Sequence, residues 1–241
     1  MMKKSKFRQM STGDRVFTIV NYSLLMLVLI IELYPLVYVV AASFSDPQAV
    51  VSGKVFLFPV NPTLKGYAAV FKNKKILTGF SNSIFYLIVG TVLNLVMTML
   101  CAYPLSRKEF RARGFLSMFF VFTMYFSGGM VPTYLLVRDL GMYNTVWAVL
   151  VPAALSTYNL IVAKTFFENS IPEELYESAY LDGCGNIQML FKIVLPLSKA
   201  ILAVLVLYYA VGIWNSYFDA LIYLKDTAKH PLQIVLRNIL L

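Results

Sequence analysis

Long apolar runs set the limits on what this chain can fold into. Five stretches, residues 16–42, 81–104, 115–137, 142–166 and 199–224, each hold 20 or more mostly apolar residues, about the length that an α-helix needs to cross a bilayer. Hydrophobic residues make up 59% of the 241, against roughly 45–50% in soluble domains. The sequence therefore predicts an all-α integral membrane protein with several spans.

The charges between these runs indicate how the chain is oriented. The formal net charge is +9, but the cations gather beside the apolar runs, which favours topology over nucleic-acid binding. Loops rich in Lys and Arg stay in the cytoplasm and suit an anionic inner leaflet. We therefore expect a multi-pass plasma (inner) membrane protein with a cytoplasmic N-terminus, in contact with lipid and with no nucleic acid. The two clusters are Lys3, Lys4, Lys6, Arg8 and Arg15, and then Arg107, Lys108, Arg111 and Arg113.

The same topology places the loop 105–114 and an acidic hairpin, residues 168–198, in the cytoplasm. A helix that merely lies at the membrane interface is normally rich in Lys and Arg on its polar face. Acids would instead be repelled by anionic lipid, so we expect this hairpin to dock on a protein partner. The acids are Glu168, Glu173, Glu174, Glu177 and Asp182.

Local signals predict how the helices of the hairpin begin and end. Ser170 and Glu173 have the spacing of a capping box, and Pro172 in a first turn costs no helical hydrogen bond. Gly183 permits the left-handed backbone that ends a helix. Asp182 or Asn186 can cap the N-terminus of the helix that follows. We expect two short helices joined at Gly183.

Three short motifs follow one another through the hairpin. The pattern resembles the EAA loop of ABC importer permeases, and this resemblance implies a coupling helix that docks into a separate cytoplasmic ATPase. The motifs are Glu177-Ser178-Ala179, then Asp182-Gly183-Cys184, then Ile193-x-Leu195-Pro196. The residues that the resemblance assigns to ATPase coupling are Glu173, Glu174, Glu177, Ser178, Ala179, Asp182, Gly183, Cys184 and Pro196.

Two further segments widen the resemblance. Residues 127–145, SGGMVPTYLLVRDLGMYNT, and residues 214–219, WNSYFD, are similar to the carbohydrate (maltose-type) group of these permeases, above all to permeases for oligosaccharides or polysaccharide fragments. The resemblance implies the helix bundle of a type I ABC importer (MetI-like). It also implies three partners: an ATPase dimer, a second homologous permease and an extracytoplasmic sugar-binding protein.

The resemblance also bears on domain organisation. We expect residues 1–75 to hold the N-terminal tail, the first span and an outer loop, and residues 76–241 to hold the core permease domain. Permeases of this group usually have a sixth span. Here only eight weakly apolar residues, 234–241, follow the last outer loop, and eight residues cannot cross a bilayer. We therefore expect five spans, with the sixth missing from a truncated form.

A substrate path is predicted from polar and aromatic residues inside the spans. Polar residues there usually face the bundle interior or a wet cavity, but Trp and Tyr also form interfacial belts and Asn also joins helices. These alternatives stay open, as does the role of Glu32 in the first span. Gly128-Gly129 indicates a break or a close helix approach in the third span. The candidates are Trp214, Asn215, Tyr217 and Asp219, with Asn82 and Asn94.

The chain lacks the motifs of an energy source or a catalyst. It has no G-x-x-x-x-G-K-[ST] phosphate loop, no Ser/His/Asp set and no metal-ligand spacing. We expect a non-enzymatic subunit that binds no cofactor or metal, with ATP and Mg²⁺ bound by the partner ATPase. An ion-coupled secondary transporter would need mid-membrane charges and inverted repeats. A membrane-embedded enzyme would need clustered catalytic groups. A further alternative is a scaffold that recruits the ATPase without transporting a substrate.

Overall fold

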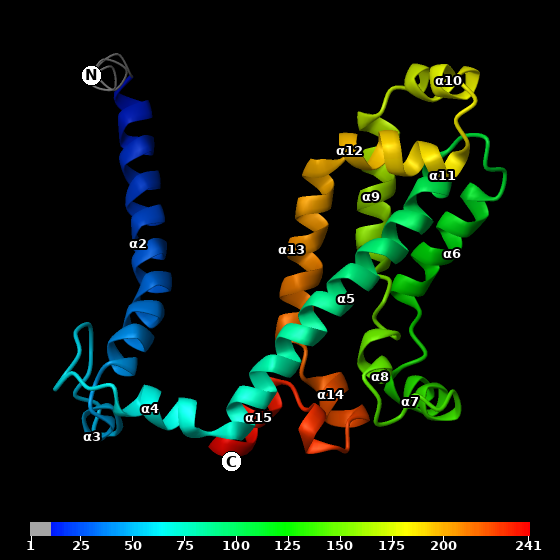
Figure 1. Cartoon of the computed structure of the whole chain (residues 1–241). Coiled ribbons are helices and arrows are strands. Elements are labelled where there is room, and N and C mark those ends of the chain that lie inside the picture. The colour runs from blue at the N-terminus through cyan, green and yellow to red at the C-terminus, as the bar shows by residue number, and fades with distance from the viewer. Residues whose placement is uncertain (1–10) are drawn as a thin grey trace. The chain divides into compact units, whose positions relative to one another are not determined.

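The computed structural model describes residues 11–241, and the chain divides into two compact units, Met1–Asn73 and Lys74–Leu241. The described residues form helices and loops with no strand among them (Figure 1). The basic cluster expected to hold the N-terminus in the cytoplasm lies, apart from Arg15, outside the described residues.

The first unit is built around one long helix, α2 (Thr12–Ser43). Its 32 residues span about 48 Å at 1.5 Å per residue, which exceeds the roughly 30 Å of bilayer hydrocarbon. Nearly all its side chains are exposed, Glu32 included, as expected of a helix whose solvent is lipid. Two short helices follow, α3 (Pro47–Val51) and α4 (Lys65–Lys72). The expected first span, residues 16–42, lies within this one helix, which is long and apolar enough to cross a membrane.

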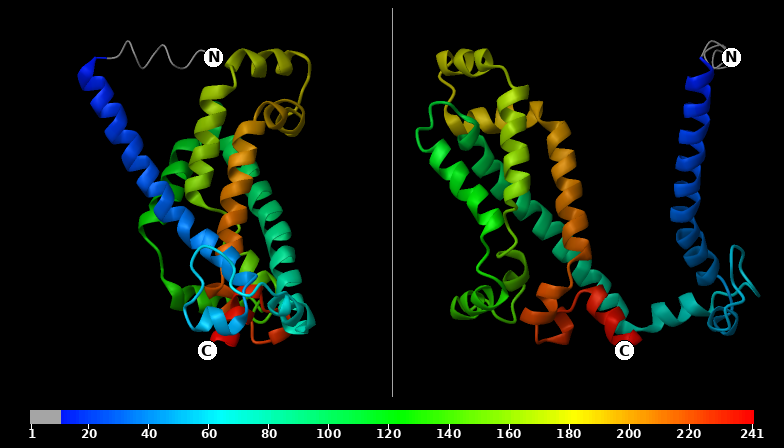
Figure 2. Two further views of the ribbon diagram at one scale, coloured as in Figure 1. Left: turned by 90° about the vertical axis from the view of Figure 1, so that its left-hand side faces the viewer. Right: turned by 180° about the vertical axis from the view of Figure 1, so that it is seen from behind.

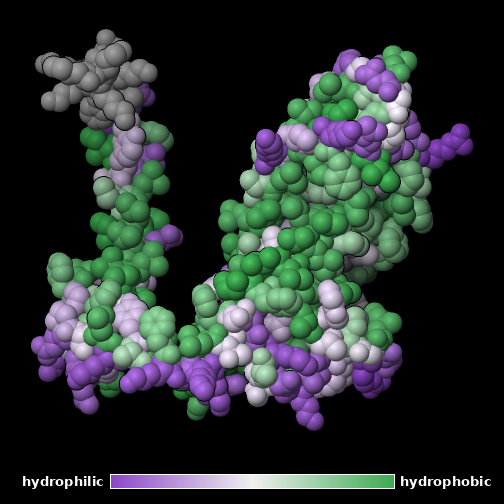
Figure 3. Space-filling view, in the orientation of Figure 1, coloured by the Kyte–Doolittle hydropathy of each residue, from purple (hydrophilic) through white to green (hydrophobic). Residues whose placement is uncertain are grey.

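The second unit is a helix bundle. Its longest member, α5 (Lys74–Ser106), contacts α6 (Arg113–Tyr125), α9 (Thr157–Ser170) and α13 (Lys199–Asn215), and these helices run side by side in the views of Figures 1 and 2. Hydrophobic side chains cover the middle of this unit, and hydrophilic ones gather at its two ends (Figure 3). This banding is what a bilayer requires of a spanning bundle.

Small residues let the bundle helices approach one another. A Cβ at Gly90 of α5 would lie 2.8 Å from Ile213 Cδ1 and 3.0 Å from Leu150 Cδ2, so a larger residue there would force these side chains to move. Ala102 and Ala163 are fully buried between α5 and α9. This use of Gly and Ala is typical of helix packing in membranes, where close backbone contact replaces the hydrophobic effect as the driving force.

Short helices close both ends of the bundle (Figure 1). One end carries α10 (Glu173–Leu181), α11 (Asn186–Met189), a π-helical turn (Leu190–Val194) and α12 (Leu195–Leu197). The opposite end carries α7 (Met130–Asp139), α8 (Trp147–Leu150), α14 (Phe218–Tyr223), a 3₁₀ turn (Thr227–Lys229) and α15 (Leu232–Leu240). We call the first the hairpin end.

The expected spans are only partly continuous. Among the described residues, α2 and α5 are long and apolar enough to cross a membrane alone, and up to four crossings result if two bent pairs each count as one. The predicted third span, 115–137, breaks between α6 and α7 with a bend of 115°. Gly129, at φ +86°, occupies the left-handed backbone that favours glycine, so the predicted break at Gly128-Gly129 is confirmed.

The predicted fourth and fifth spans were drawn too long. Residues 151–156 interrupt the fourth, since Pro152 offers no backbone N–H for a helix, and only α9, with 14 residues, continues it. The fifth, predicted as 199–224, ends at Asn215, where Ser216 turns extended before α14 begins. Hydropathy averages over such breaks because apolar residues flank them on both sides.

Candidate functional site: an acidic hairpin and a cavity in the bundle

The acidic hairpin forms two short helices, but it does not start as predicted. Ser170 is the last residue of α9, and α10 begins at Glu173 after an extended Pro172, with no side-chain cap. The predicted capping box is therefore wrong. Ser170 remains helical within α9, and the Glu173 carboxylate is engaged by cations of another loop rather than reaching back.

The helix ends as predicted. Gly183 adopts φ +76°, its N–H bonds to the Tyr180 carbonyl at 3.0 Å, and the Cys184 N–H bonds to the Ala179 carbonyl at 2.9 Å. This pair of bonds is the Schellman arrangement, which satisfies the last carbonyls of a helix. The second cap is not as predicted, because Gly185 precedes α11 and Asn186 instead accepts from the Tyr180 hydroxyl at 2.6 Å.

One face of α10 is buried against the bundle. Tyr176 and Ala179 are 2% and 7% exposed, and they pack in a core with Phe167, Met189 and Leu190. Ala179, which the motif assigned to ATPase coupling, therefore faces inward, where its small side chain lets α10 lie close to the bundle.

The opposite face of the hairpin is exposed and acidic. Glu174, Glu177 and Asp182 are exposed, and none of them has an ion pair within residues 11–241. Leu181 and Ile187 stand beside them, 89% and 77% exposed. The sequence motif did not single out these two apolar residues. The sequence feature that could have identified them is the presence of large aliphatic side chains in a polar turn.

The remaining coupling candidates, Ser178, Cys184 and Pro196, belong to the local structure of the hairpin. The Ser178 hydroxyl donates to the Glu174 carbonyl of its own helix at 2.8 Å, and Cys184 is half-buried behind the turn. Pro196 is exposed in α12, just before α13 begins. These residues shape the hairpin, whereas the exposed acids and Leu181 and Ile187 provide a surface.

A cluster of charges holds the start of α10 to the loop after α5. Arg107 Nη2 lies 2.8 Å from Glu109 Oε1 and 3.2 Å from Glu173 Oε1, and Lys108 Nζ lies 3.2 Å from Glu173 Oε2. Lys108 and then Arg107 lower the pKa of the Glu173 carboxyl, with burial opposing them. Both partners were expected at the same side of the membrane, but their contact was not predicted.

A cavity of about 340 Å³, lined by polar and apolar side chains, lies between α5, α8, α13, α14, α15 and the start of α9. Asn94 is 4% exposed, and its Oδ1 has no hydrogen-bond partner within the described residues. A buried carbonyl oxygen without a partner is costly and can accept from a ligand hydroxyl. Polar residues that line the cavity include Asn94, Asn159, Tyr208, Ser216, Asp219 and Gln233.

Only two of the six substrate-path candidates, Asn94 and Asp219, line this cavity. Trp214 is half-buried edge-on to Phe80, Asn215 donates to the Val211 carbonyl of its own helix at 2.9 Å, and Tyr217 is 43% exposed ahead of α14. The sequence could not separate the six, because a side chain's direction depends on where the helix breaks.

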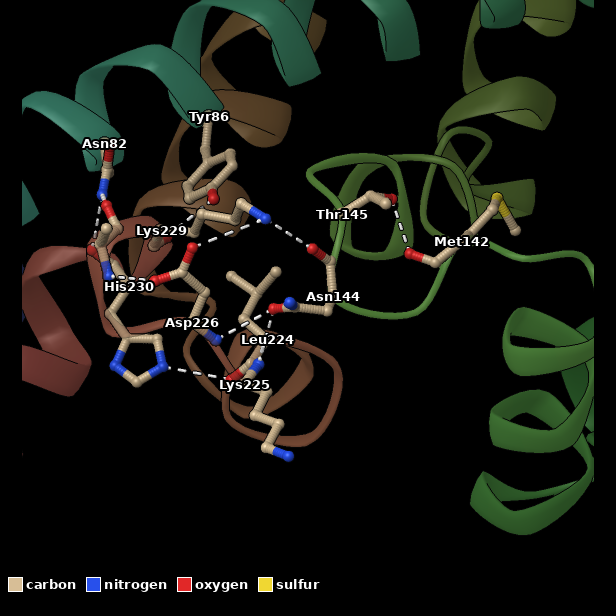
Figure 4. A network of polar contacts seen from close by, with 11 residues as sticks. Asn82, Tyr86, Met142, Asn144, Thr145, Leu224, Lys225, Asp226, Lys229 and His230 are labelled. Atoms are coloured by element: carbon tan, nitrogen blue, oxygen red, sulfur yellow. Dashed lines mark hydrogen bonds and ion pairs between the residues drawn. The ribbon is translucent and has the colours of Figure 1, made fainter.

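Asn82, the sixth candidate, has a structural task at the end opposite the hairpin (Figure 4). Its amide donates to the carbonyls of Ala228 at 2.7 Å and His230 at 3.0 Å. Asn144, at φ +58°, accepts from two successive backbone N–H groups of the same segment at 3.0 and 2.9 Å. These bonds fix the loop between α14 and α15 to α5 and to the turn before α8.

The residues that the structure describes contain no group of three or more His, Cys, Asp or Glu side chains that could hold a metal ion. Two features of the described chain could receive other molecules: the exposed acidic face of the hairpin and the cavity inside the bundle.

The chain resembles known proteins along nearly its whole length. It is 43% identical over 227 residues to protein LplC of Bacillus subtilis (strain 168), covering 94% of this chain and 77% of that one. It is 42% identical over 228 residues to the polygalacturonan/rhamnogalacturonan transport system permease protein YtcP of the same organism, with 95% and 79% covered.

A solved structure agrees with this similarity. A bacterial ABC transporter involved in the import of the acidic polysaccharide alginate matches with a TM-score of 0.90 and 37% identity, over 95% of this chain and 81% of that chain. The predicted fold class, a type I ABC importer bundle, is thereby confirmed. Residues 94–234 match the family model "Binding-protein-dependent transport system inner membrane component". The chain belongs to this family of ABC transporter permease subunits.

Proposed function

We propose that this chain is the permease subunit of an ATP-driven importer that moves an oligosaccharide across the plasma membrane by alternating access. The observation that carries the proposal is the hairpin: a helix with a Schellman C-terminus, whose inner face is buried in the bundle and whose outer face presents acids with no ion pair among residues 11–241. Such an element transmits movement between a docked partner and the membrane helices.

We place a separate ATPase dimer on the exposed face of the hairpin. Glu174, Glu177 and Asp182 have no ion pairs within the described chain, and Leu181 and Ile187 beside them add exposed apolar surface rimmed by polar residues, which marks a protein interaction site. Such a surface fits a partner groove with cations around an apolar centre. ATP and Mg²⁺ would bind to that partner. The hairpin end would then be cytoplasmic, and with it the N-terminus.

We place the sugar in the cavity of the bundle, at Asn94 and Asp219. Carboxamide and carboxylate groups hydrogen-bond sugar hydroxyls, and Tyr208 adds an aromatic ring to the lining. The oligosaccharide class is supported by the names of relatives such as YtcP and by the alginate importer. A second homologous permease would supply the other wall of the path, and an extracytoplasmic sugar-binding protein would deliver the substrate at the opposite end.

Co-purification tests the ATPase site. The double charge reversal Glu177→Lys with Asp182→Lys places two cations where the partner expects acids, so we expect at least a tenfold loss of ATPase subunit from the complex purified from native membranes. The control is Asp139→Lys, which reverses an exposed acid at the end of α7, on the opposite end of the bundle, and should leave the ATPase bound.

Equal ATPase recovery in the double variant and the control would overturn this docking site. Uptake that continues without any ATPase, and that collapses when ion gradients are dissipated, would instead favour a secondary transporter.

A further inference from the structure

Arg107 carries a buried charge that topology alone does not explain. It follows the last residue of α5, and it is only 7% exposed. A basic residue that serves the positive-inside rule would extend its head group into water or lipid head groups. A buried charge is instead costly unless it is paired, so the contacts of Arg107 must justify its burial.

Those contacts reach α10 from two directions. Arg107 Nη2 lies 3.2 Å from Glu173 Oε1, and the guanidinium carbon lies 3.5 Å from the centroid of the Tyr176 ring. Glu173 and Tyr176 are three residues apart, so they lie on the same side of the helix. A planar cation held by an acid at its edge and a ring against its face fixes both the position and the rotation of α10.

Two further ion pairs flank the contact between Arg107 and Glu173, one from Glu109 to Arg107 and one from Lys108 to Glu173. Glu109 holds the guanidinium at 2.8 Å, which orients it from the loop side. Lys108 pairs with the outer oxygen of Glu173, but its side chain is 71% exposed and the pair is therefore weak. Within residues 11–241, the ion pairs and the cation–π contact that join α10 to the loop after α5 all use Glu173 or Tyr176.

The helix on the other side of Arg107 leads to the cavity. α5 runs from the hairpin end to the opposite end of the bundle (Figure 1), and its residues Ser83, Tyr86, Gly90 and Asn94 line the cavity. A displacement of α10 that is carried by Arg107 therefore reaches the helix that forms one wall of the cavity.

We infer that Arg107 is a positioning residue that transmits movement of the hairpin to α5, so that ATP hydrolysis by the partner docked on the hairpin is coupled to rearrangement of the cavity. The inference rests on the proposed function, since it needs an ATPase docked on the hairpin. It assigns a task to a loop cation that lies outside the coupling motif.

The test uses the whole importer reconstituted in proteoliposomes, with uptake and ATP hydrolysis measured together. In Arg107→Gln we expect the ATPase to remain bound and the basal hydrolysis rate to stay within about twofold of wild type, whereas sugar moved per ATP falls about tenfold. Arg107→Lys keeps the charge but loses the planar fork, so it should recover part of that ratio. A residue that only stabilised the fold would lower both rates together.

Tyr176 supplies a matched pair of variants. Its hydroxyl is buried without a hydrogen-bond partner within the described residues, so Tyr176→Phe keeps the ring under Arg107 and should leave the coupling ratio unchanged. Tyr176→Leu removes the ring and should lower it. In a double-mutant cycle, Glu173→Gln should add little to Arg107→Gln, since both break the same contact.

Three outcomes would overturn the inference: an unchanged coupling ratio in Arg107→Gln, loss of the bound ATPase in parallel with uptake, or additive effects in the cycle with Glu173→Gln. Failure of the proposed function has a different signature, because the wild-type importer would then show no ATP-driven uptake at all.

Discussion

Glu173 and Glu177 lie one turn apart on α10, and their surroundings give them different tasks. Glu173 is half-buried and contacts Arg107 and Lys108, whereas Glu177 is exposed with no ion pair among the described residues. The sequence motif treats both as docking acids. The structure instead uses the first to hold the helix to its own chain and leaves the second available to a partner.

The ion pairs of Glu173 make hairpin stability depend on pH. Its pKa is lowered in the folded chain by Lys108 and then Arg107, while Glu109 contacts the same Nη2 atom of Arg107 and the Tyr176 ring lies against the face of the guanidinium. A carboxyl with a lowered folded-state pKa stabilises the fold above its unfolded-state pKa, and that contribution is lost as pH falls through the folded-state value.

Glu173→Gln should therefore destabilise the chain by about 0.5 kcal/mol at neutral pH, as expected for a partly exposed pair. The difference from wild type should shrink as pH falls below about 4.5. Thermal unfolding in detergent at pH 7 and at pH 3.5 measures it. Glu177→Gln is the control and should differ little from wild type at either pH; an equal loss in both variants would refute the assignment.

The short helix α15 is held against the bundle by contacts with α5 and α13. Ile234 is fully buried, the Leu232 N–H donates to the Ser83 hydroxyl at 2.8 Å, and Gln233 donates to the Trp214 carbonyl. The side chain of Val235 and the backbone of Leu232 pack directly over a glycine of α5. The segment that hydropathy described as a weakly apolar tail is thus a docked helix.

Gly79→Ala tests this contact between elements. The added Cβ would lie 2.9 Å from Val235 Cγ2 and 3.2 Å from Leu232 Cα, and since a backbone atom cannot simply rotate away, α15 must shift. We expect a loss of about 1–3 kcal/mol in the free energy of unfolding, the usual cost of overpacking, measured by denaturation in detergent. Gly114→Ala, with no atom within 4 Å of its Cβ, should cause no loss. Equal stability of the two variants would contradict the packing.

At the scale of the whole molecule, the two candidate surfaces are separated along the bundle. The hairpin lies at one end, the cavity lies between α5, α13 and α14, and the polar network of Figure 4 closes the opposite end. Separate sites for docking and for substrate predict separable defects, with hairpin variants losing the ATPase and cavity variants losing uptake.

Asn94→Ala tests the cavity. Its carboxamide oxygen is buried without a partner in the described residues, so its loss should cost the contact with sugar and not the fold. A tenfold rise in the KM for uptake, about 1.4 kcal/mol, is expected, with ATPase recovery unchanged. Asn215→Ala is the control because that amide bonds to its own helix. Unchanged uptake kinetics in Asn94→Ala would remove Asn94 from the substrate path.

Much of this architecture was predictable because it depends on local or additive properties. Apolar length identified α2 and α5, the glycine at 183 predicted a left-handed helix end, and the spacing of three short motifs identified the family. The broken third span was also anticipated at Gly128-Gly129. None of these inferences requires knowledge of which segments touch.

Contacts between distant segments decided the rest. The sequence by itself determined that the chain is an all-helical membrane permease with an acidic hairpin. Only the tertiary structure decided that Ala179 faces inward, that Glu173 pairs with the buried Arg107, and that Asn94 and Asp219 share a cavity while Asn82 and Asn215 do not. The physical reason is that a side chain's partners depend on where each helix breaks and how it is rotated, and these follow from packing across the bundle.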